Sequence, residues 1–290
     1  MARNFMELLK ARWAESKFVC VGLDSEFDKI PKSAHQSGNE CDVSIANTIV
    51  EFNRRIVEAT KDLVCAYKPN SAFYEAYGSE GINALWRTIA DIRFIAPEVP
   101  VILDYKRGDI GNTNTGYVKA AFNFMGADAV TVHPYLGAEA LNPFLAQADK
   151  GVIVLCRTSN PGAGEFQDMD VSGDMVPGGY MPFYKYVAHR VSQYWNKNNN
   201  CAVVVGATYP SELHEVRQTV GDLPILIPGI GAQGGDLERT VAAGKNSKNQ
   251  GMIINSSRGI IFASSGEDFA KAAAAKAKEL RDAINNAIPA

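Results

Sequence analysis

The sequence predicts a single (β/α)8 barrel, and three observations lead to this fold class. Short apolar runs rich in β-branched residues recur at wide spacing along the 290 residues. Such nearly continuous runs suit strands that are buried on both faces, as in a parallel sheet. Stretches with helical spacing lie between the runs, and this alternation is typical of α/β folds. The strand candidates number eight, as a barrel of this kind requires.

The predicted strands follow one another from the N-terminus to the C-terminus. They cover 18–24, 63–70, 99–106, 128–135, 151–159, 201–208, 223–231 and 251–259. Helical patterns follow the first three of these strands, at 45–62, 81–96 and 114–126. The last strand is followed by 267–287, which reads as a plain surface helix. A doubly wound open sheet is the alternative fold, but no GxGxxG motif follows any predicted strand.

Two stretches interrupt this regular alternation. Residues 25–44 are polar and rich in turn formers, and residues 160–182 are dense in Gly, Pro and Asp. Both follow the C-terminal end of a strand, on the face where barrel enzymes carry their active sites. We expect two long loops there, either lids or binding loops or tolerated surface insertions. No linker divides the chain, so one barrel domain is expected over 1–290.

Composition and charge exclude several classes of protein. The net charge is −3, and no basic run suggests binding to nucleic acid. No apolar run approaches the roughly 20 residues that a membrane-spanning helix needs. Residues 1–18 are charged throughout and therefore do not resemble a signal peptide. The five cysteines are scattered without a CxxC pair, which argues against a disulfide framework or a structural zinc site. We expect a cytoplasmic protein whose buried thiols are reduced, namely Cys20, Cys65, Cys156 and Cys201.

Charged residues gather at the end of the third predicted strand, in "VILDYKRGDIGNT" (101–113). Asp104 and Lys106 are two apart and therefore project to the same face of a strand, while Asp109 lies in the following turn. Alone, this pattern is commonly a local salt bridge of little energetic value. Lys68, however, ends the neighbouring second strand, and we expect it to join Asp104, Lys106 and Asp109 in an alternating Lys–Asp–Lys–Asp array in which each charge favours its neighbours' ionisation. Lys106 should then remain a protonated ammonium, which suits a proton donor and not a Schiff-base nucleophile.

The turns after the seventh and eighth strands predict a phosphate site. They are "PGIGAQGG" (228–235) and "SSRG" (256–259), and they occupy the region where barrels often bind phosphate. Glycines let backbone amides approach oxygens closely, and Arg258 can hold a phosphate group in a bidentate fork. Gln233 adds an amide donor. Plain turn glycines are the alternative interpretation.

Three further polar residues end predicted strands. Asp24 could accept hydrogen bonds from sugar hydroxyls or cap the following segment. Ser159 could contact a ligand amide or bond its own turn. His133 is interpreted as a structural residue. No HxH or HExxH pattern is present, so a zinc centre is not expected.

These residues together resemble one known family. "DYKRGDIGNT" resembles the DxKxxDI…T signature of the orotidine 5′-monophosphate decarboxylases. The resemblance spans the barrel through "GLD" (22–24), "YKPN" (67–70), "TSNPGA" (158–163) and the two glycine-rich turns described above. The DxKxxD core alone is shared with sister barrels, but the complete set is specific to the family.

The resemblance implies a cofactor-free and metal-free decarboxylation of orotidine 5′-monophosphate to UMP, a step of de novo pyrimidine biosynthesis. By the family pattern, Lys68 contacts the ribose and orders the charged array. Asp104 sits against the substrate carboxylate, and Lys106 protonates C6 as carbon dioxide leaves. The remaining substrate contacts implied are ribose for Asp24, pyrimidine for Ser159, and the 5′-phosphate for Gln233, Arg258 and the backbone near Ser257.

The family pattern also implies a homodimer with shared active sites. In it, Asp109 and Thr113 reach the ribose bound to the partner subunit. The sequence departs from the common pattern at Gly108, at Ser257 where many members have glycine, and in its two long loops. It therefore resembles the longer, divergent bacterial branch of the family.

Two other functions remain as alternatives. A magnesium-dependent sister barrel would act on a sugar phosphate through an enediolate. Such members typically carry an acidic metal ligand at the second strand, where this chain has Lys68. A non-catalytic phosphate-binding barrel would be expected to lose part of the charged array, and all of it is present here.

Overall fold

The computed structural model describes residues 3–37, 44–230 and 236–288, and its main sheet is a barrel of eight parallel strands. Their order in the sheet is β2-β1-β10-β9-β8-β5-β4-β3. Bridges from Tyr67 to Val101 and from Asn70 to Asp104 bring β2 beside β3 and so join the two ends of the sheet. The predicted fold class is confirmed, and every strand overlaps its predicted range. The strands are β1 (Val19–Gly22), β2 (Val64–Lys68), β3 (Ile102–Arg107), β4 (Ala129–Val132), β5 (Gly151–Arg157), β8 (Cys201–Val205), β9 (Ile225–Pro228) and β10 (Met252–Ser256).

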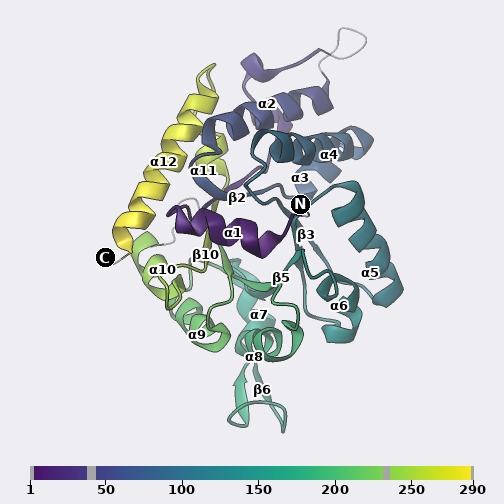
Figure 1. Cartoon of the computed structure of the whole chain (residues 1–290), viewed down its shortest axis with the longest axis vertical. Helices are drawn as coiled ribbons and strands as arrows, with labels where there is room; N and C mark the ends of the chain where they lie inside the picture. The colour runs from purple at the N-terminus through teal and green to yellow at the C-terminus, as the bar shows by residue number, and fades with distance from the viewer. Residues whose placement is uncertain (1–2, 38–43, 231–235, 289–290) are drawn as a thin grey trace.

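Helices form an outer layer around these strands (Figure 1). The long ones are α2 (Ile45–Thr60), α4 (Gly78–Ile95), α5 (Gly111–Val118), α6 (Gly137–Leu145), α8 (Phe183–Arg190), α9 (Pro210–Val220), α10 (Leu237–Gly244) and α12 (Phe269–Ala287). Both α5 and α8 run on into a π-helical turn, at Lys119–Phe124 and Val191–Trp195. Single-turn helices α3 (Ala72–Glu75) and α11 (Arg258–Ile261) follow β2 and β10. None of the helices in the described ranges has the length and apolar character that crossing a membrane requires.

An additional helix, α1 (Phe5–Ala14), covers the end of the barrel where the strands begin. It buries Phe5, Leu9 and Trp13, and the Trp13 indole donates to the carbonyl of Met252 at 2.8 Å. The buried Arg12 donates to the carbonyl of Val64 at 2.9 Å. This end of the barrel is therefore covered, and the functional opening lies at the other end.

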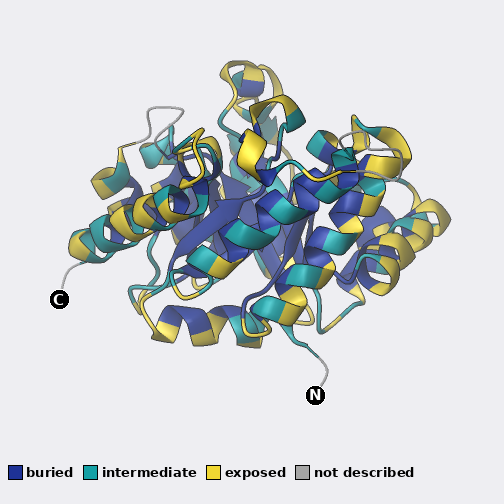
Figure 2. Cartoon of the chain, turned by 90° about the horizontal axis from the view of Figure 1, so that it is seen from above, coloured by how far each residue is buried: buried dark blue, intermediate teal, exposed yellow. Residues whose placement is uncertain are grey.

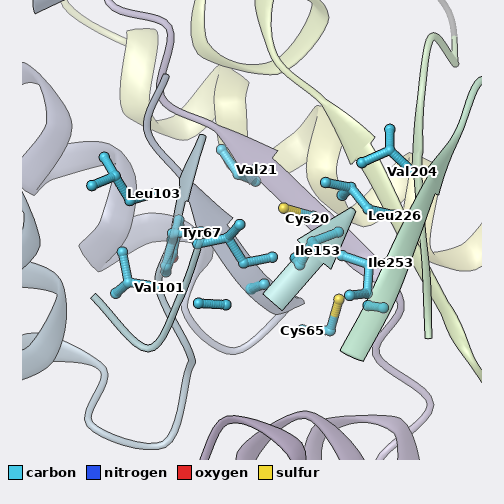
Figure 3. Packing of buried hydrophobic residues seen from close by; sticks show 14 of the residues in the cluster. Cys20, Val21, Cys65, Tyr67, Val101, Leu103, Ile153, Val204, Leu226 and Ile253 are labelled. Carbon is cyan, nitrogen blue, oxygen red and sulfur yellow. The ribbon is translucent and has the colours of Figure 1, made fainter. Parts of the chain in front are cut away.

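The strands pack their side chains into a continuous apolar core (Figure 3). Every residue of β1, β2, β4 and β8 is buried, which explains why their sequences are apolar without alternation. Figure 2 shows the same division, with buried strands inside and helices exposed only on their outer faces. The four cysteines expected to be buried are buried and unbridged, and burial raises the pKa of the Cys20 thiol to about 12.

The segment after β5, predicted as a long loop, contains regular structure of its own. A short helix, α7 (Gly164–Gln167), precedes a hairpin of β6 (Asp170–Ser172) and β7 (Tyr180–Pro182) that projects away from the barrel (Figure 1). The turn of the hairpin contains Gly178 and Gly179, whose φ angles of 74° and 86° are positive values that glycine adopts readily. Its base is held to the barrel by an ion pair between the buried Arg157, at the end of β5, and Asp168 at 2.9 Å.

Candidate active site

A cavity of about 520 Å³ opens at the C-terminal ends of the strands. Side chains from the ends of most strands reach it, so the barrel brings together residues that are far apart in the sequence. The lining includes these residues predicted from the sequence: Asp24, Lys68, Asp104, Lys106, Ser159, Ser257 and Arg258. This is the face on which barrel enzymes carry their active sites.

Four charged groups form a connected chain along one wall of the cavity. Lys68 Nζ lies 2.9 Å from Asp104 Oδ2, and Lys106 Nζ lies 2.6 Å from Asp104 Oδ1. Lys68 Nζ is also 3.9 Å from Asp24 Oδ1. The structure thus confirms the contact predicted between the ends of β2 and β3, with Asp104 held between two ammonium groups.

The electrostatics of this chain keep Lys68 and Asp104 charged. Burial opposes the charge on Lys68, but the carboxylates of Asp104 and Asp24 outweigh it and raise the pKa of Lys68 above its usual value. Burial would likewise raise the pKa of Asp104, but the charges of Lys68 and Lys106 lower it well below its usual range. A buried carboxylate and a buried ammonium are therefore both ionised at neutral pH.

Lys106 differs from its neighbours in exposure and in backbone conformation. Its side chain is 47% exposed, whereas that of Lys68 is 5% exposed, so the Lys106 ammonium stands at the open side of the array. Its φ angle is 48°, in the left-handed region that non-glycine residues rarely adopt. Local strain of this kind is found at functional sites, where the surrounding structure holds it in place.

The structure does not bring Asp109 and Thr113 to this cavity. Neither is among the described residues that line it. Asp109 Oδ1 accepts the backbone N–H of Ile110 at 2.7 Å, and Thr113 is exposed on the first turn of α5. Ile110, next to Asp109 in the sequence, is 57% exposed.

The phosphate region predicted after the last two strands is partly described. Ser257 and Arg258 line the cavity together with Gly229. A side chain at Gly22 would come within 1.9 Å of Ser257 Oγ, so the glycine of "GLD" lets the turn after β10 pack directly on β1. Gln233 lies outside the described residues.

Ser159 reaches the cavity from the end of β5. A side chain at Gly206 would come within 2.6 Å of Ser159 Cβ, so this turn packs closely against the end of β8. The neighbouring Thr158 is held by Gln167, whose Oε1 accepts the Thr158 N–H at 2.8 Å. Gln167 itself lines the cavity, so α7 is part of the site.

His133 packs against the backbone at the end of β3, which agrees with its interpretation as a structural residue. A side chain at Gly108 would come within 2.7 Å of the His133 imidazole. Glycine in this unusual signature position therefore makes room for the histidine ring. The backbone N–H of His133 donates to the carbonyl of Arg107 at 3.1 Å, which ties the end of β4 to the end of β3.

Sequence reasoning missed several polar residues of the cavity, notably Thr131 on β4 and Asn255 on β10. Asn255 is 6% exposed and its Oδ1 has no hydrogen-bond partner among the described residues. The available signal was the presence of polar residues within otherwise apolar runs, Thr131 in "AVTV" and Asn255 in "MIINS". Within the described ranges, no three His, Cys, Asp or Glu residues are grouped so that they could hold a metal ion.

Comparisons with known proteins agree on one family. Residues 17–273 match the family described as "Orotidine 5′-phosphate decarboxylase / HUMPS family". An orotidine 5′-phosphate decarboxylase of Cellvibrio japonicus is 46% identical over 283 residues, which are 97% of this chain and 98% of that protein. The solved OMP decarboxylase of Leishmania donovani is 37% identical with a TM-score of 0.80, and 98% of each chain is covered. The solved Leishmania donovani UMP synthase is 39% identical with a TM-score of 0.83, covering 98% of this chain but 56% of that longer one.

Proposed function

Because the chain belongs to the orotidine 5′-phosphate decarboxylase / HUMPS family, we propose that it is a carboxy-lyase of pyrimidine biosynthesis that converts orotidine 5′-monophosphate to UMP and carbon dioxide without a cofactor. The observation that carries this proposal is the chain of charges in the cavity, in which Asp104 lies between Lys68 and Lys106 at 2.9 and 2.6 Å. Such a chain supplies a fixed positive charge and a proton donor from the protein itself.

Lys106 is the proposed proton donor. When the bond between C6 and the carboxylate carbon breaks, its electron pair stays on C6 and carbon dioxide departs. The Lys106 ammonium stabilises this negative charge as it develops and transfers a proton to C6. The resulting amine regains a proton from solvent, which its 47% exposed side chain can reach. Because Asp104 fixes the ammonium before substrate arrives, little reorganisation is needed at the moment of reaction.

Asp104 favours the transition state over the bound substrate. Its carboxylate would stand against the substrate carboxylate, a repulsion that disappears as neutral carbon dioxide forms. The charge left on C6 is met by Lys106 instead. An interaction that improves between ground state and transition state lowers the barrier, whereas equal binding of both does not.

The other polar groups would position the substrate. Asp24 Oδ1 is buried without a hydrogen-bond partner in the described structure, which suits an acceptor for ribose hydroxyls, with Lys68 beside it. Ser159 would contact the pyrimidine ring. Arg258, the backbone near Ser257 and Gln233 would bind the 5′-phosphate, whose binding energy helps to orient the distant base.

We also propose that two chains share their active sites in a homodimer. Asp109 and Thr113 belong to the family signature yet lie on the surface, outside the described cavity lining. Ile110, next to Asp109, is exposed, as are Tyr135 and Leu136 just beyond the neighbouring strand β4, and these apolar side chains suit burial against a second copy. A two-fold axis would bring Asp109 and Thr113 of each chain to the ribose held by the other.

The loss of orotidine 5′-monophosphate absorbance tests this function, when followed with and without EDTA. Equal rates in both conditions are expected, because Lys68 and Lys106 supply the positive charge of the site. A rate that collapses with EDTA and returns with Mg²⁺ would favour the magnesium-dependent sister barrel. Binding of UMP without any turnover would favour the non-catalytic phosphate-binding barrel.

A further inference from the structure

An interruption in the barrel sheet lies directly at the charged array. The pairing of β3 with β4 joins Leu103 to Val130 and next joins Arg107 to Val132. Three residues of β3, numbers 104–106, therefore stand opposite the single residue Thr131 of β4. A bulge of this kind leaves backbone groups without their regular partners and re-aims the side chains that it carries.

The Thr131 hydroxyl replaces the missing backbone partners. Its Oγ1 accepts the backbone N–H of Tyr105 and that of Lys106, each at 3.1 Å. The same hydroxyl donates to Asp104 Oδ1 at 2.9 Å. A hydroxyl group has one donor and two acceptor positions, and these three hydrogen bonds occupy all of them. The residue is 1% exposed, so these bonds are largely shielded from solvent.

Two of these three bonds involve Asp104 and Lys106, the two residues that define the array. One holds the carboxylate of Asp104 by the same Oδ1 that accepts Lys106 Nζ at 2.6 Å. Another holds the Lys106 backbone, whose φ angle of 48° would relax without support. No other residue of β4 can do this, because its neighbours Val130 and Val132 have no polar side chain.

We propose that Thr131 is the positioning residue of the reaction, fixing the Asp104 carboxylate and the Lys106 ammonium in their reactive arrangement. This inference rests on the proposed decarboxylation, but its geometric part can be tested separately. Thr131 acts through Asp104 and Lys106, so its loss should impair the chemical step while leaving the binding of phosphate and ribose intact.

The test compares Thr131→Val, which keeps the shape and removes the hydroxyl, with Thr131→Ser, which keeps the hydroxyl. For Thr131→Val, kcat should fall about 10- to 100-fold, the size expected for losing a hydrogen bond to a charged group. KM and the Kd for UMP should change by less than about threefold, because the substrate-binding groups remain. Thr131→Ser should restore kcat to within about threefold of the wild type. Thr60→Val is the matched control, because it removes another buried hydroxyl, one bonded to the carbonyl of Ile56 outside the cavity lining.

A crystal structure of Thr131→Val supplies a readout that does not depend on turnover. The Lys106 backbone should leave the left-handed region, and the Lys106–Asp104 contact should lengthen. An unchanged contact with unchanged kcat would overturn the inference. So would a loss of kcat that Thr131→Ser fails to restore, or equal losses in Thr131→Val and Thr60→Val.

If Thr131→Val does not fold, Thr131→Ala takes its place with the same expectations. A wild-type protein without turnover would defeat the proposed decarboxylation, while the crystal structure would still decide the role of Thr131.

Discussion

Replacing Asp104 with asparagine should destabilise the fold as well as the site. The Asp104 side chain is 10% exposed, and its carboxylate holds the ammonium of Lys68, whose side chain is 5% exposed, at 2.9 Å. Asparagine has nearly the same shape but no charge, so Lys68 would keep only Asp24, at 3.9 Å, as an opposite charge. Removing one partner of a buried ion pair costs about 3–5 kcal/mol. Because Asp24 offsets part of that cost, we expect the free energy of unfolding to fall by about 3 kcal/mol at pH 7.

The pH dependence of this difference follows from the direction of the Asp104 shift. Lys68 and Lys106 lower the pKa of Asp104 below its unfolded value of about 3.9. The stability that the charge contributes is therefore fully present above about pH 4 and is lost as pH falls toward the folded pKa. The difference between wild type and Asp104→Asn should stay constant from about pH 8 to pH 5 and shrink below about pH 4. The raised pKa of Lys68 does not alter this window, since that contribution is lost only at strongly alkaline pH.

Urea unfolding at fixed protein concentration, repeated at several pH values, measures this difference. Asp149→Asn is the control, because Asp149 is 45% exposed and pairs with Lys150 at 3.3 Å on the surface. It should cost less than about 1 kcal/mol. If Asp104→Asn costs no more than this control, the array is not a buried and mutually dependent unit. A difference that grows as pH falls from 5 to 3 would contradict the assigned direction of the Asp104 pKa.

The other predictions concern phosphate binding and assembly. Arg258→Ala should lower kcat/KM by about 10- to 100-fold, mainly through KM, and guanidinium ion should partly restore it, because the lost bond is charge-assisted and remote from C6. Arg281→Ala on α12 is the control, and an unaltered kcat/KM in Arg258→Ala would remove Arg258 from the site. Lys106→Ala and Asp109→Ala homodimers should each be nearly inactive. The two homodimers are then dissociated, mixed and allowed to reassemble at random, so that about half of the dimers are hybrids. Each hybrid has one site with both defects and one intact site, so about a quarter of all sites should be intact. Recovery near zero, with hybrids verified by native mass spectrometry, would show that Asp109 serves its own chain.

The fold could be predicted because the strands of the barrel are buried on both faces along most of their length. That burial requires uninterrupted apolar sequences such as "CAVVV" in β8, and these stand out against the amphipathic helices. The hairpin of β6 and β7 could not be predicted in the same way. Its strands have three residues each and none of these residues is buried, so no hydrophobic pattern marks them.

The charged array could also be predicted, since it follows from two local rules. Residues 104 and 106 are two apart at the end of one strand, which predicts that they project together, and the ends of neighbouring parallel strands lie close together, which brings in Lys68. The role of Thr131 could not be predicted, because it depends on a shift of register between β3 and β4. A shift of this kind is a property of the paired strands and leaves no mark on the periodicity of either one.

The position of Asp109 shows a third limit. The sequence places it in the turn beyond β3, close to Lys106 along the chain. The turn carries it away from the cavity, and its carboxylate bonds to the backbone N–H of Ile110. Distance along a chain does not decide which of two symmetry-related sites a loop residue serves, so only the reassembly experiment can assign it.

The most direct measurement of the central claim is the turnover of Lys106→Ala with orotidine 5′-monophosphate, combined with its affinity for UMP. The predicted result is a loss of kcat of at least about 10³-fold, with the fold retained and the Kd for UMP changed by less than about tenfold. Lys276→Ala, which removes an exposed lysine of α12, should match the wild type in both measurements. Lys106→Ala with kcat within about tenfold of the wild type would contradict the assignment of Lys106 as the proton donor to C6.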